Sequence, residues 1–163
     1  MSPRLGRGLP CMPLTSSRIQ PCLWFDDSLA DAARFYTAIF PNSSIDHLTP
    51  MAGEFTLDGI TFRGINGGPA LPFTEAVSFA VTCRDQSEVD YYWDSLADGG
   101  EESVCGWLKD RFGLSWQIVP ERLYELVTDP DPQRAEAVTR AMLGMRRIVV
   151  AELEAAAGVN PAG

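Results

Sequence analysis

The sequence predicts an α+β fold in which two βαβββ modules pack against each other and C-terminal helices follow. Strand, helix and three-strand patterns occur twice in the same order. The segment 59–62 (GITF) also recurs as 113–116 (GLSW). With 163 residues, 45% of them hydrophobic, the chain can bury one sizeable core. A duplicated unit that cannot bury its own sheet must pack against its copy, and a cleft between copies is a typical ligand site.

The first module begins with an apolar strand at residues 19–25, in which Pro21 indicates an edge position because proline lacks an N–H donor. Residues 26–28 (DDS) predict the N-cap of a helix that runs to about Phe40. Its buried stripe comprises Ala32, Phe35, Tyr36 and Ile39. Two strands follow at about 44–49 and 54–58, and Asp58-Gly59 predicts a tight hairpin into a strand at 60–66.

The second module repeats this order with a strand at 76–83, a helix that starts at 85–88 (DQSE), short strands near 102–109 and a strand at 114–119. Beyond Pro120 the pattern becomes helical, with helices at about 134–143 and 150–157. We therefore expect a disordered leader at 1–17, a paired domain at 18–120, and C-terminal helices at 121–163 that pack on the same domain.

Charge and cysteine usage narrow the possible partners. A net charge of −9 argues against a nucleic-acid backbone as partner, since phosphate binding needs a basic face. No apolar run approaches the ~20 residues of a membrane span, and the N-terminus lacks the apolar core of a secretion signal. The four cysteines form no CxxC pair and His47 is the only histidine, which excludes a zinc site of ordinary spacing. We expect a cytoplasmic protein with reduced thiols.

Five segments resemble a known family: PCLWFDDSLADAARFY, LDGITFRGINGGP, VDYYWDSLADGG, CGWLKDRFGLSWQIVP and DPDPQRAEAVTRAMLGM. Together they are similar to the PhnB-like branch of the vicinal oxygen chelate superfamily, a branch that often bears the name demethylubiquinone methyltransferase. The resemblance covers residues 18–157. It implies a glyoxalase-like fold of paired βαβββ units around a cavity, commonly in a homodimer. The superfamily includes lactoylglutathione lyase, extradiol dioxygenases and antibiotic-resistance proteins.

The resemblance also implies a position for a divalent metal, with ligands at Gln20, Arg63, Ala76 and Gln117 in this chain. Alanine supplies no donor and arginine is a permanent cation, whereas a dication needs oxygen or imidazole donors with negative charge among them. We therefore predict no metal and no cofactor. The glycine pairs 67–68 and 99–100 are not in the strand–turn–helix context of a nucleotide-binding turn, which argues against S-adenosylmethionine.

Strand alternation predicts the side chains that line the cavity. If Leu23, Phe62 and Trp116 pack beneath the helices, the opposite parity faces the concave side. We expect the ligand to contact Gln20, Cys22, Trp24, Thr61, Arg63, Ala76, Ser78, Trp107 and Gln117. Arg63 is the candidate for an anionic group, and the alternative is that it pairs with an acidic side chain. The space beside the small residues could instead be filled by Trp24 or Trp107.

These observations favour a metal-free protein that binds a small polar or anionic molecule between its two modules. One alternative is an enzyme of the superfamily (a lyase, isomerase or dioxygenase) or the methyltransferase of the family name. The other is a dimeric interaction module whose cleft is filled by side chains. The expected partners are a small molecule and a second copy of the chain, with no nucleic acid and no membrane.

Overall fold

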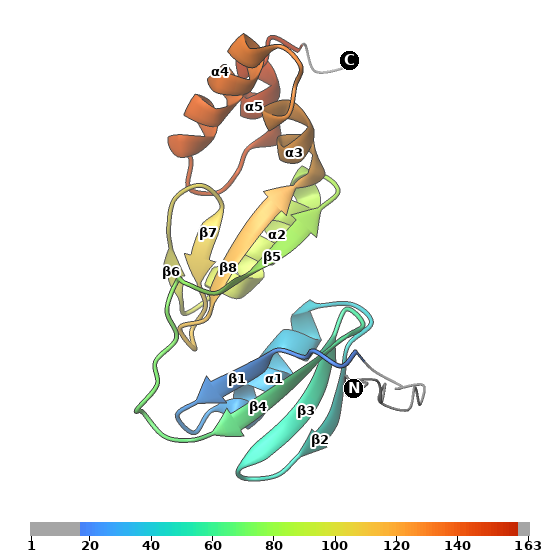
Figure 1. Cartoon of the computed structure of the whole chain (residues 1–163), viewed down its shortest axis with the longest axis vertical. Coiled ribbons are helices and arrows are strands. Elements are labelled where there is room, and N and C mark those ends of the chain that lie inside the picture. Colours follow the sequence, from blue (N-terminus) through green and yellow to red (C-terminus); the bar gives the residue numbers. More distant parts are fainter. Residues whose placement is uncertain (1–16, 160–163) are drawn as a thin grey trace, which may run out of the picture.

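The computed structural model describes residues 17–159, so the predicted leader lies almost entirely outside the described residues. The first module consists of β1 (Cys22–Phe25), α1 (Leu29–Ile39), β2 (Ser44–Leu48), β3 (Ala52–Leu57) and β4 (Ile60–Asn66). The second consists of β5 (Ser78–Cys83), α2 (Gln86–Ala97), β6 (Glu101–Glu102), β7 (Trp107–Lys109) and β8 (Ser115–Pro120). The C-terminal helices are α3 (Glu121–Val127), α4 (Pro132–Leu143) and α5 (Val150–Ala156). The three parts follow one another along the long axis of the molecule (Figure 1).

The two modules share one topology. The strand order is β1-β4-β3-β2 in the first sheet and β5-β8-β7-β6 in the second. In each sheet the first strand is parallel to the last, and the other pairs are antiparallel. The predicted α+β fold of paired βαβββ modules is therefore confirmed. The first strands, β1 and β5, are edge strands that pair on one side only within residues 17–159.

Local chemistry explains most of the element boundaries. Asp58 and Gly59 both have positive φ, 44° and 79°, which is the type I′ hairpin that an Asp-Gly pair favours. Asp85 caps α2 by accepting a hydrogen bond from the Glu88 backbone N–H at 3.0 Å. Ser28 is the N-cap residue of α1, as 26–28 predicts, but its side chain makes no cap bond. The Leu29 N–H instead donates to Asn66 Oδ1 at 3.0 Å, so a side chain of β4 caps the helix.

Two strands start later than predicted. β1 begins at Cys22 rather than at residue 19, and β5 begins at Ser78, which leaves Ala76 in the turn that precedes it. Pro21 lacks an N–H, and β1 starts at the residue after it. The Pro21 carbonyl still accepts from the Arg63 N–H at 2.9 Å, so the chain contacts β4 one residue before β1 begins.

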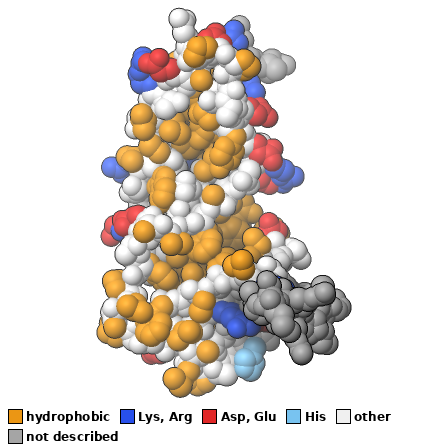
Figure 2. Space-filling view, in the orientation of Figure 1, with side chains coloured by type: hydrophobic (Ala, Val, Ile, Leu, Met, Phe, Trp, Pro, Cys, Tyr) orange, Lys and Arg blue, Asp and Glu red, His pale blue; other side chains and the backbone are white. Residues whose placement is uncertain are grey.

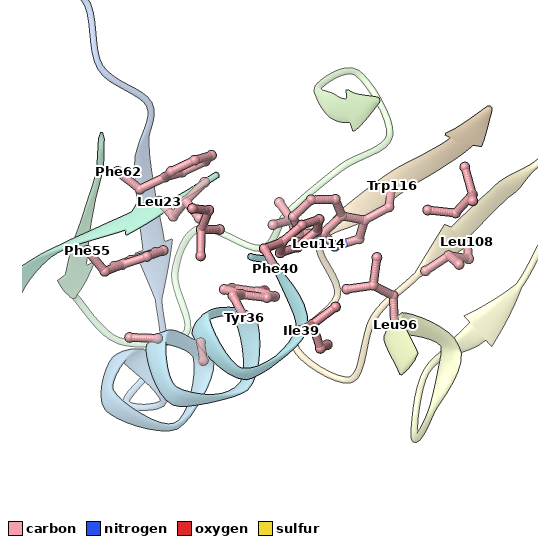
Figure 3. Packing of buried hydrophobic residues seen from close by; sticks show 14 of the residues in the cluster. Leu23, Tyr36, Ile39, Phe40, Phe55, Phe62, Leu96, Leu108, Leu114 and Trp116 are labelled. Carbon is pink, nitrogen blue, oxygen red and sulfur yellow. The ribbon is translucent and has the colours of Figure 1, made fainter. Parts of the chain in front are cut away.

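One aromatic core joins the modules. In Figure 1, α1 and α2 lie behind their sheets, so both helices cover the same side. The ring of Trp116 on β8 lies 5.5 Å from that of Tyr36 and 5.4 Å from that of Phe40, both from the first module. Phe62 and Phe79 make a third contact across the junction at 5.2 Å. Figure 3 shows Tyr36 and Phe40 of the first module beside Trp116 of the second, and the modules therefore share a single core.

A buried carboxylate lies in this junction. Asp110, in the β7–β8 turn, is only 3% exposed. One of its oxygens accepts from Tyr36 Oη at 2.7 Å and Trp116 Nε1 at 2.8 Å. The other accepts from the backbone N–H groups of Phe112 at 2.8 Å and Leu114 at 3.1 Å. Burial raises the pKa of Asp110 and outweighs these four hydrogen bonds, which lower it. The carboxyl group ties α1 of one module to the strand connection of the other.

The C-terminal helices have their own core. It contains Val119, Leu123, Leu126, Val138, Met145, Ile148, Leu153 and Ala157. Val119 comes from β8 and is buried because the helices cover its end of the strand. Within residues 17–159, no helix is long and apolar enough to cross a bilayer. The boundary that we expect between a paired domain at 18–120 and the helices at 121–163 stays a prediction.

Candidate functional site

Each sheet turns one face to its helix and leaves the other outward. Leu23, Phe62 and Trp116 are buried beneath the helices, as strand alternation predicts. Figure 2 shows the outward side, where apolar side chains occupy the middle and most charged groups lie at the margins. Exposed apolar side chains on the outward faces or beside them include Ile65, Val77 and Val104. Contiguous exposed apolar surface of this kind is typical of a binding face.

The predicted site residues of the first module do not form a closed site. Cys22 and Arg63 are neighbours in the β1–β4 register and both are exposed. Arg63 Nε lies 3.4 Å from Glu54 Oε2, so the guanidinium faces a carboxylate, the alternative considered for it. Thr61 is half-buried on the same face. Gln20 is half-buried just before β1 rather than on the strand.

Trp24 packs against the start of the crossover that joins the modules. Its Nε1 donates to the Gly68 carbonyl at 2.9 Å. A Cβ on Gly67 would overlap the Trp24 ring, so glycine is needed here for close packing. This contact accounts for Gly67, and Gly68 has a positive φ of 85°, which favours glycine. Trp24 lines a cavity of about 350 Å³ together with Phe73 and Phe112.

The second sheet brings three of the predicted residues together. Gln117 Nε2 donates to Ser78 Oγ at 2.8 Å across β5 and β8. Trp107 on β7 lies opposite Gln117 in the register. Ala76 is exposed in the turn before β5 and is not on the strand. The predicted nine-residue set is therefore divided between two sheets.

A cavity of about 460 Å³ lies beside the β6–β7 hairpin of this second sheet. It belongs to the second module and the adjoining crossover. Two smaller cavities, of about 350 and 310 Å³, are lined by residues of both modules, which is where the sequence predicts a cavity. Its lining comprises Glu75, Glu101, Glu102, Ser103, Val104, Cys105, Trp107, Leu108, Lys109 and Ser115. Trp107 is the one residue of the predicted set among them. The volume is within the range of small-molecule sites, about 300–1,000 Å³.

Ser115 is the unusual member of this lining. It is 1% exposed, and its Oγ is the one buried side-chain nitrogen or oxygen atom without a hydrogen-bond partner in residues 17–159. Buried polar atoms are nearly always paired, so an unpaired one needs an explanation. Strand alternation places Ser115 on the outward face, but nothing local distinguishes it from other outward residues. Its neighbours in the sheet are Lys109 of β7 and Ser78 of β5, and Ser78 lies 37 residues earlier in the sequence.

The rim of the cavity is more acidic than basic. Glu75, Glu101 and Glu102 line it, and Lys109 is the only basic residue in its lining. The Lys109 ammonium pairs with Glu75, which raises the pKa of Lys109 and lowers the pKa of Glu75, so both are ionised at neutral pH. Since the single cation already has a partner, this rim does not favour the anionic ligand that we expected from Arg63.

The residues at the inferred metal positions do not fit a metal. Gln20, Arg63, Ala76 and Gln117 include a cation and a side chain with no donor, and no carboxylate, imidazole or thiolate. Nowhere in residues 17–159 do three His, Cys, Asp or Glu side chains gather as a group that could hold an ion. We therefore derive no chemical step through a metal in this chain.

Comparison with known proteins places the chain in a family. Residues 17–119 match the profile of the 3-demethylubiquinone-9 3-methyltransferase family. The PhnB protein from Bacillus cereus is 30% identical, with a TM-score of 0.58, over 64% of this chain and 99% of its own. Protein PA1353 from Pseudomonas aeruginosa is 20% identical, with a TM-score of 0.53, over 65% of this chain and 98% of its own.

A more distant match is the fosfomycin resistance protein FosX from Listeria monocytogenes in complex with Mn(II) and sulfate. It is 18% identical, with a TM-score of 0.50, over 66% of this chain and 91% of its own, and shows a shared fold alone. A search of curated protein sequences gave no match. Since the profile spans more than half of the chain and the 30% identical PhnB protein is covered over 99% of its length, the chain belongs to the PhnB-like 3-demethylubiquinone-9 3-methyltransferase family.

Proposed function

We propose that this chain is a metal-free binding protein that holds a small, uncharged polar molecule in the cavity beside Ser115. The observation that carries the proposal is Ser115, a residue in the wall of a cavity of about 460 Å³ whose buried hydroxyl has no partner among the described residues. Leaving such a group unpaired costs about 1–3 kcal/mol, and a ligand hydroxyl, amide or carbonyl group would recover that energy.

The other lining groups indicate the character of this molecule. Trp107 offers a broad apolar surface, and Val104 and Leu108 are aliphatic. Aromatic and aliphatic walls with a few convergent polar groups are typical of sites for small organic molecules. The three glutamates at the rim disfavour a carboxylate or phosphate, which is why we propose a neutral ligand rather than an anion.

The test is a ligand screen with a matched pair of variants. A panel of small amides, phenols, diols and carboxylic acids is added to the purified protein, and native mass spectrometry and the shift in Tm report binding. We expect neutral compounds to bind, and Ser115→Ala to weaken them by about tenfold, the loss of one buried hydrogen bond. Ser95→Ala, on α2 behind the sheet, is the control. Tight binding that is unchanged in Ser115→Ala, or that is confined to the acids, would contradict the proposal.

We also propose that a second copy of the chain covers the outward sheet faces. The support is the apolar middle of that surface with charges at its margins (Figure 2) and the unpaired outer edges of β1 and β5. Because the two modules share one topology, they can present similar surfaces to a two-fold axis that relates two copies of the chain. Sedimentation analysis should find a dimer, and Val77→Asp with Ile65→Asp should dissociate it. A monomer at micromolar concentration would refute this part.

We also propose that the protein is located in the cytoplasm. Cys22, Cys83 and Cys105 are free thiols. This is consistent with the cytoplasm, where thiols stay reduced.

A further inference from the structure

The C-terminal helices are an addition to the family domain. The family profile ends at residue 119, one residue before β8 ends, and α3, α4 and α5 follow it. The Bacillus cereus protein is matched over 99% of its own length but over only 64% of this chain, so it has almost no residues left to correspond to these helices. The role of the addition must therefore be found in its own contacts with the paired modules.

The segment between α4 and α5, residues 144–149, forms a strap against the loop 103–106. Two consecutive N–H groups of the loop donate to two consecutive carbonyls of the strap, Cys105 to Met145 and Gly106 to Arg146, both at 2.8 Å. Both loop residues have positive φ, 59° and 80°. For the non-glycine Cys105 this conformation is unfavourable, so the surrounding contacts must impose it.

The loop is also held from its other side. The Gly106 carbonyl accepts from the Ile118 N–H of β8 at 2.7 Å. A Cβ at Gly106 would lie 2.7 Å from the Ile118 carbonyl oxygen and 3.1 Å from Ile148 of the strap. Glycine is thus required because the loop is clamped between β8 and the strap. Residues 103–105 of this same loop line the cavity, so the strap fixes one of its walls.

Two side chains fasten the strap to the second module. Gln86 of α2 donates from Nε2 to the Ile148 carbonyl at 3.1 Å and accepts at Oε1 from the Val150 N–H at 2.8 Å. Arg147 of the strap pairs with Asp90 at 3.1 Å and with Asp94, both on α2. The side chains of Arg147 and Asp90 are less than half exposed, and Asp94 belongs to the same network. These ion pairs therefore contribute more to stability than an isolated surface pair does.

We infer that the C-terminal helices set the size of molecule that the cavity admits, and that Gln86 and Arg147 are the positioning residues through which they do so. Neither residue lines the cavity, and both act through the strap on the loop 103–106. The inference rests on the proposed function for the identity of the site, but it concerns the shape of the wall rather than the ligand. Chains of the family that lack these helices would need another support for this wall.

The experiment uses Cys105 as a reporter of the wall, because it lines the cavity. The full-length protein and Arg147→Ala are treated with N-ethylmaleimide or with the bulkier pyrene maleimide, and peptide mass spectrometry follows alkylation at Cys105. Hydrogen exchange of the loop 103–106 is measured in parallel. Arg140→Ala is the matched control, since Arg140 lies on α4, is largely exposed and pairs only with Glu136. Exposed Cys22 is the internal standard for reagent activity.

In the wild type we expect pyrene maleimide to react at Cys105 much more slowly than N-ethylmaleimide, relative to Cys22. Arg147→Ala should reduce this discrimination and accelerate exchange in the loop, each by about fivefold, as loss of a partly buried charged pair shifts a local opening equilibrium. Arg140→Ala should match the wild type. Equal discrimination and exchange in Arg147→Ala and Arg140→Ala would overturn the inference.

A second variant covers the case in which Arg147→Ala fails to fold. Gln86→Met keeps the side-chain volume and removes both hydrogen bonds to the strap, so it should give the same two changes, and wild-type behaviour in it would count equally against the inference. The ligand screen is a separate result. If no compound binds while these variants loosen the wall, the proposed function fails and the inference on the wall stands.

Discussion

Replacing Asp110 by asparagine tests how strongly the two modules are joined. The carboxylate accepts four hydrogen bonds, two from side chains and two from backbone N–H groups. An asparagine offers one oxygen and one NH₂ group, so about half of these donors face another donor. With about 1–3 kcal/mol for each buried donor left unpaired, we expect Asp110→Asn to lower the free energy of unfolding by about 3 kcal/mol. Small domains are stable by about 5–15 kcal/mol, so the variant should still fold.

Urea unfolding followed by far-UV circular dichroism measures this loss, since tryptophan fluorescence would report Trp116 itself. Tyr36→Phe removes one donor and should cost about 2 kcal/mol, as expected for a hydrogen bond to a charged group. The double variant should cost less than the sum of the two by about 1 kcal/mol, because Tyr36 and Asp110 share a bond. Tyr124→Phe, at an exposed position on α3, is the control and should change stability by less than about 0.5 kcal/mol.

Wild-type stability of Asp110→Asn would refute this prediction, as would additive losses in free energy of unfolding from Asp110→Asn and Tyr36→Phe. Either result would mean that the four short contacts do not join the modules energetically. A loss with the predicted coupling would instead assign part of the stability of the junction to this carboxylate, alongside the aromatic contacts around Trp116.

The remaining predictions concern Cys83, Gly67 and Ser115. Burial raises the pKa of Cys83 to about 12, so at pH 8 iodoacetamide should label exposed Cys22 and leave Cys83 unlabelled until urea unfolds the chain. The unfolded thiol loses its proton near pH 9.0 and the folded one only at about 12, so this group should make stability decline as pH rises between these values. Cys83→Ala should make the decline shallower, and the part that remains is expected from Tyr36 and Tyr92, whose pKa values are also raised. Gly67→Ala should cost about 1–3 kcal/mol and shift tryptophan emission, because Trp24 must move; unchanged emission would contradict this. Ser115→Ala should raise the stability of the ligand-free protein by about 1 kcal/mol, and a lower Tm would contradict the unpaired state of its hydroxyl.

The sequence by itself determined the elements and their order. Local signals were sufficient where the cause is local: Asp58-Gly59 for the hairpin, Asp85 for the start of α2, and strand alternation for the faces of both sheets. Where the partner lies far along the chain, local signals were insufficient. Residues 26–28 predict the N-cap position of α1 correctly, but the side-chain bond to its first N–H comes from Asn66, 38 residues beyond Ser28, and no pattern at 26–28 could indicate it.

Only the tertiary structure decided the candidate site. Alternation places Ser78 and Gln117 on one face, where they share a hydrogen bond, but it cannot show whether a cavity forms on that face. The cavity forms where the crossover, the β6–β7 hairpin and β8 converge, and a strap from the C-terminal helices holds one wall. Ser115 is buried beside Ser78 of β5, which lies 37 residues earlier in the chain, so its exposure is set by how the strands assemble and not by its sequence neighbours alone.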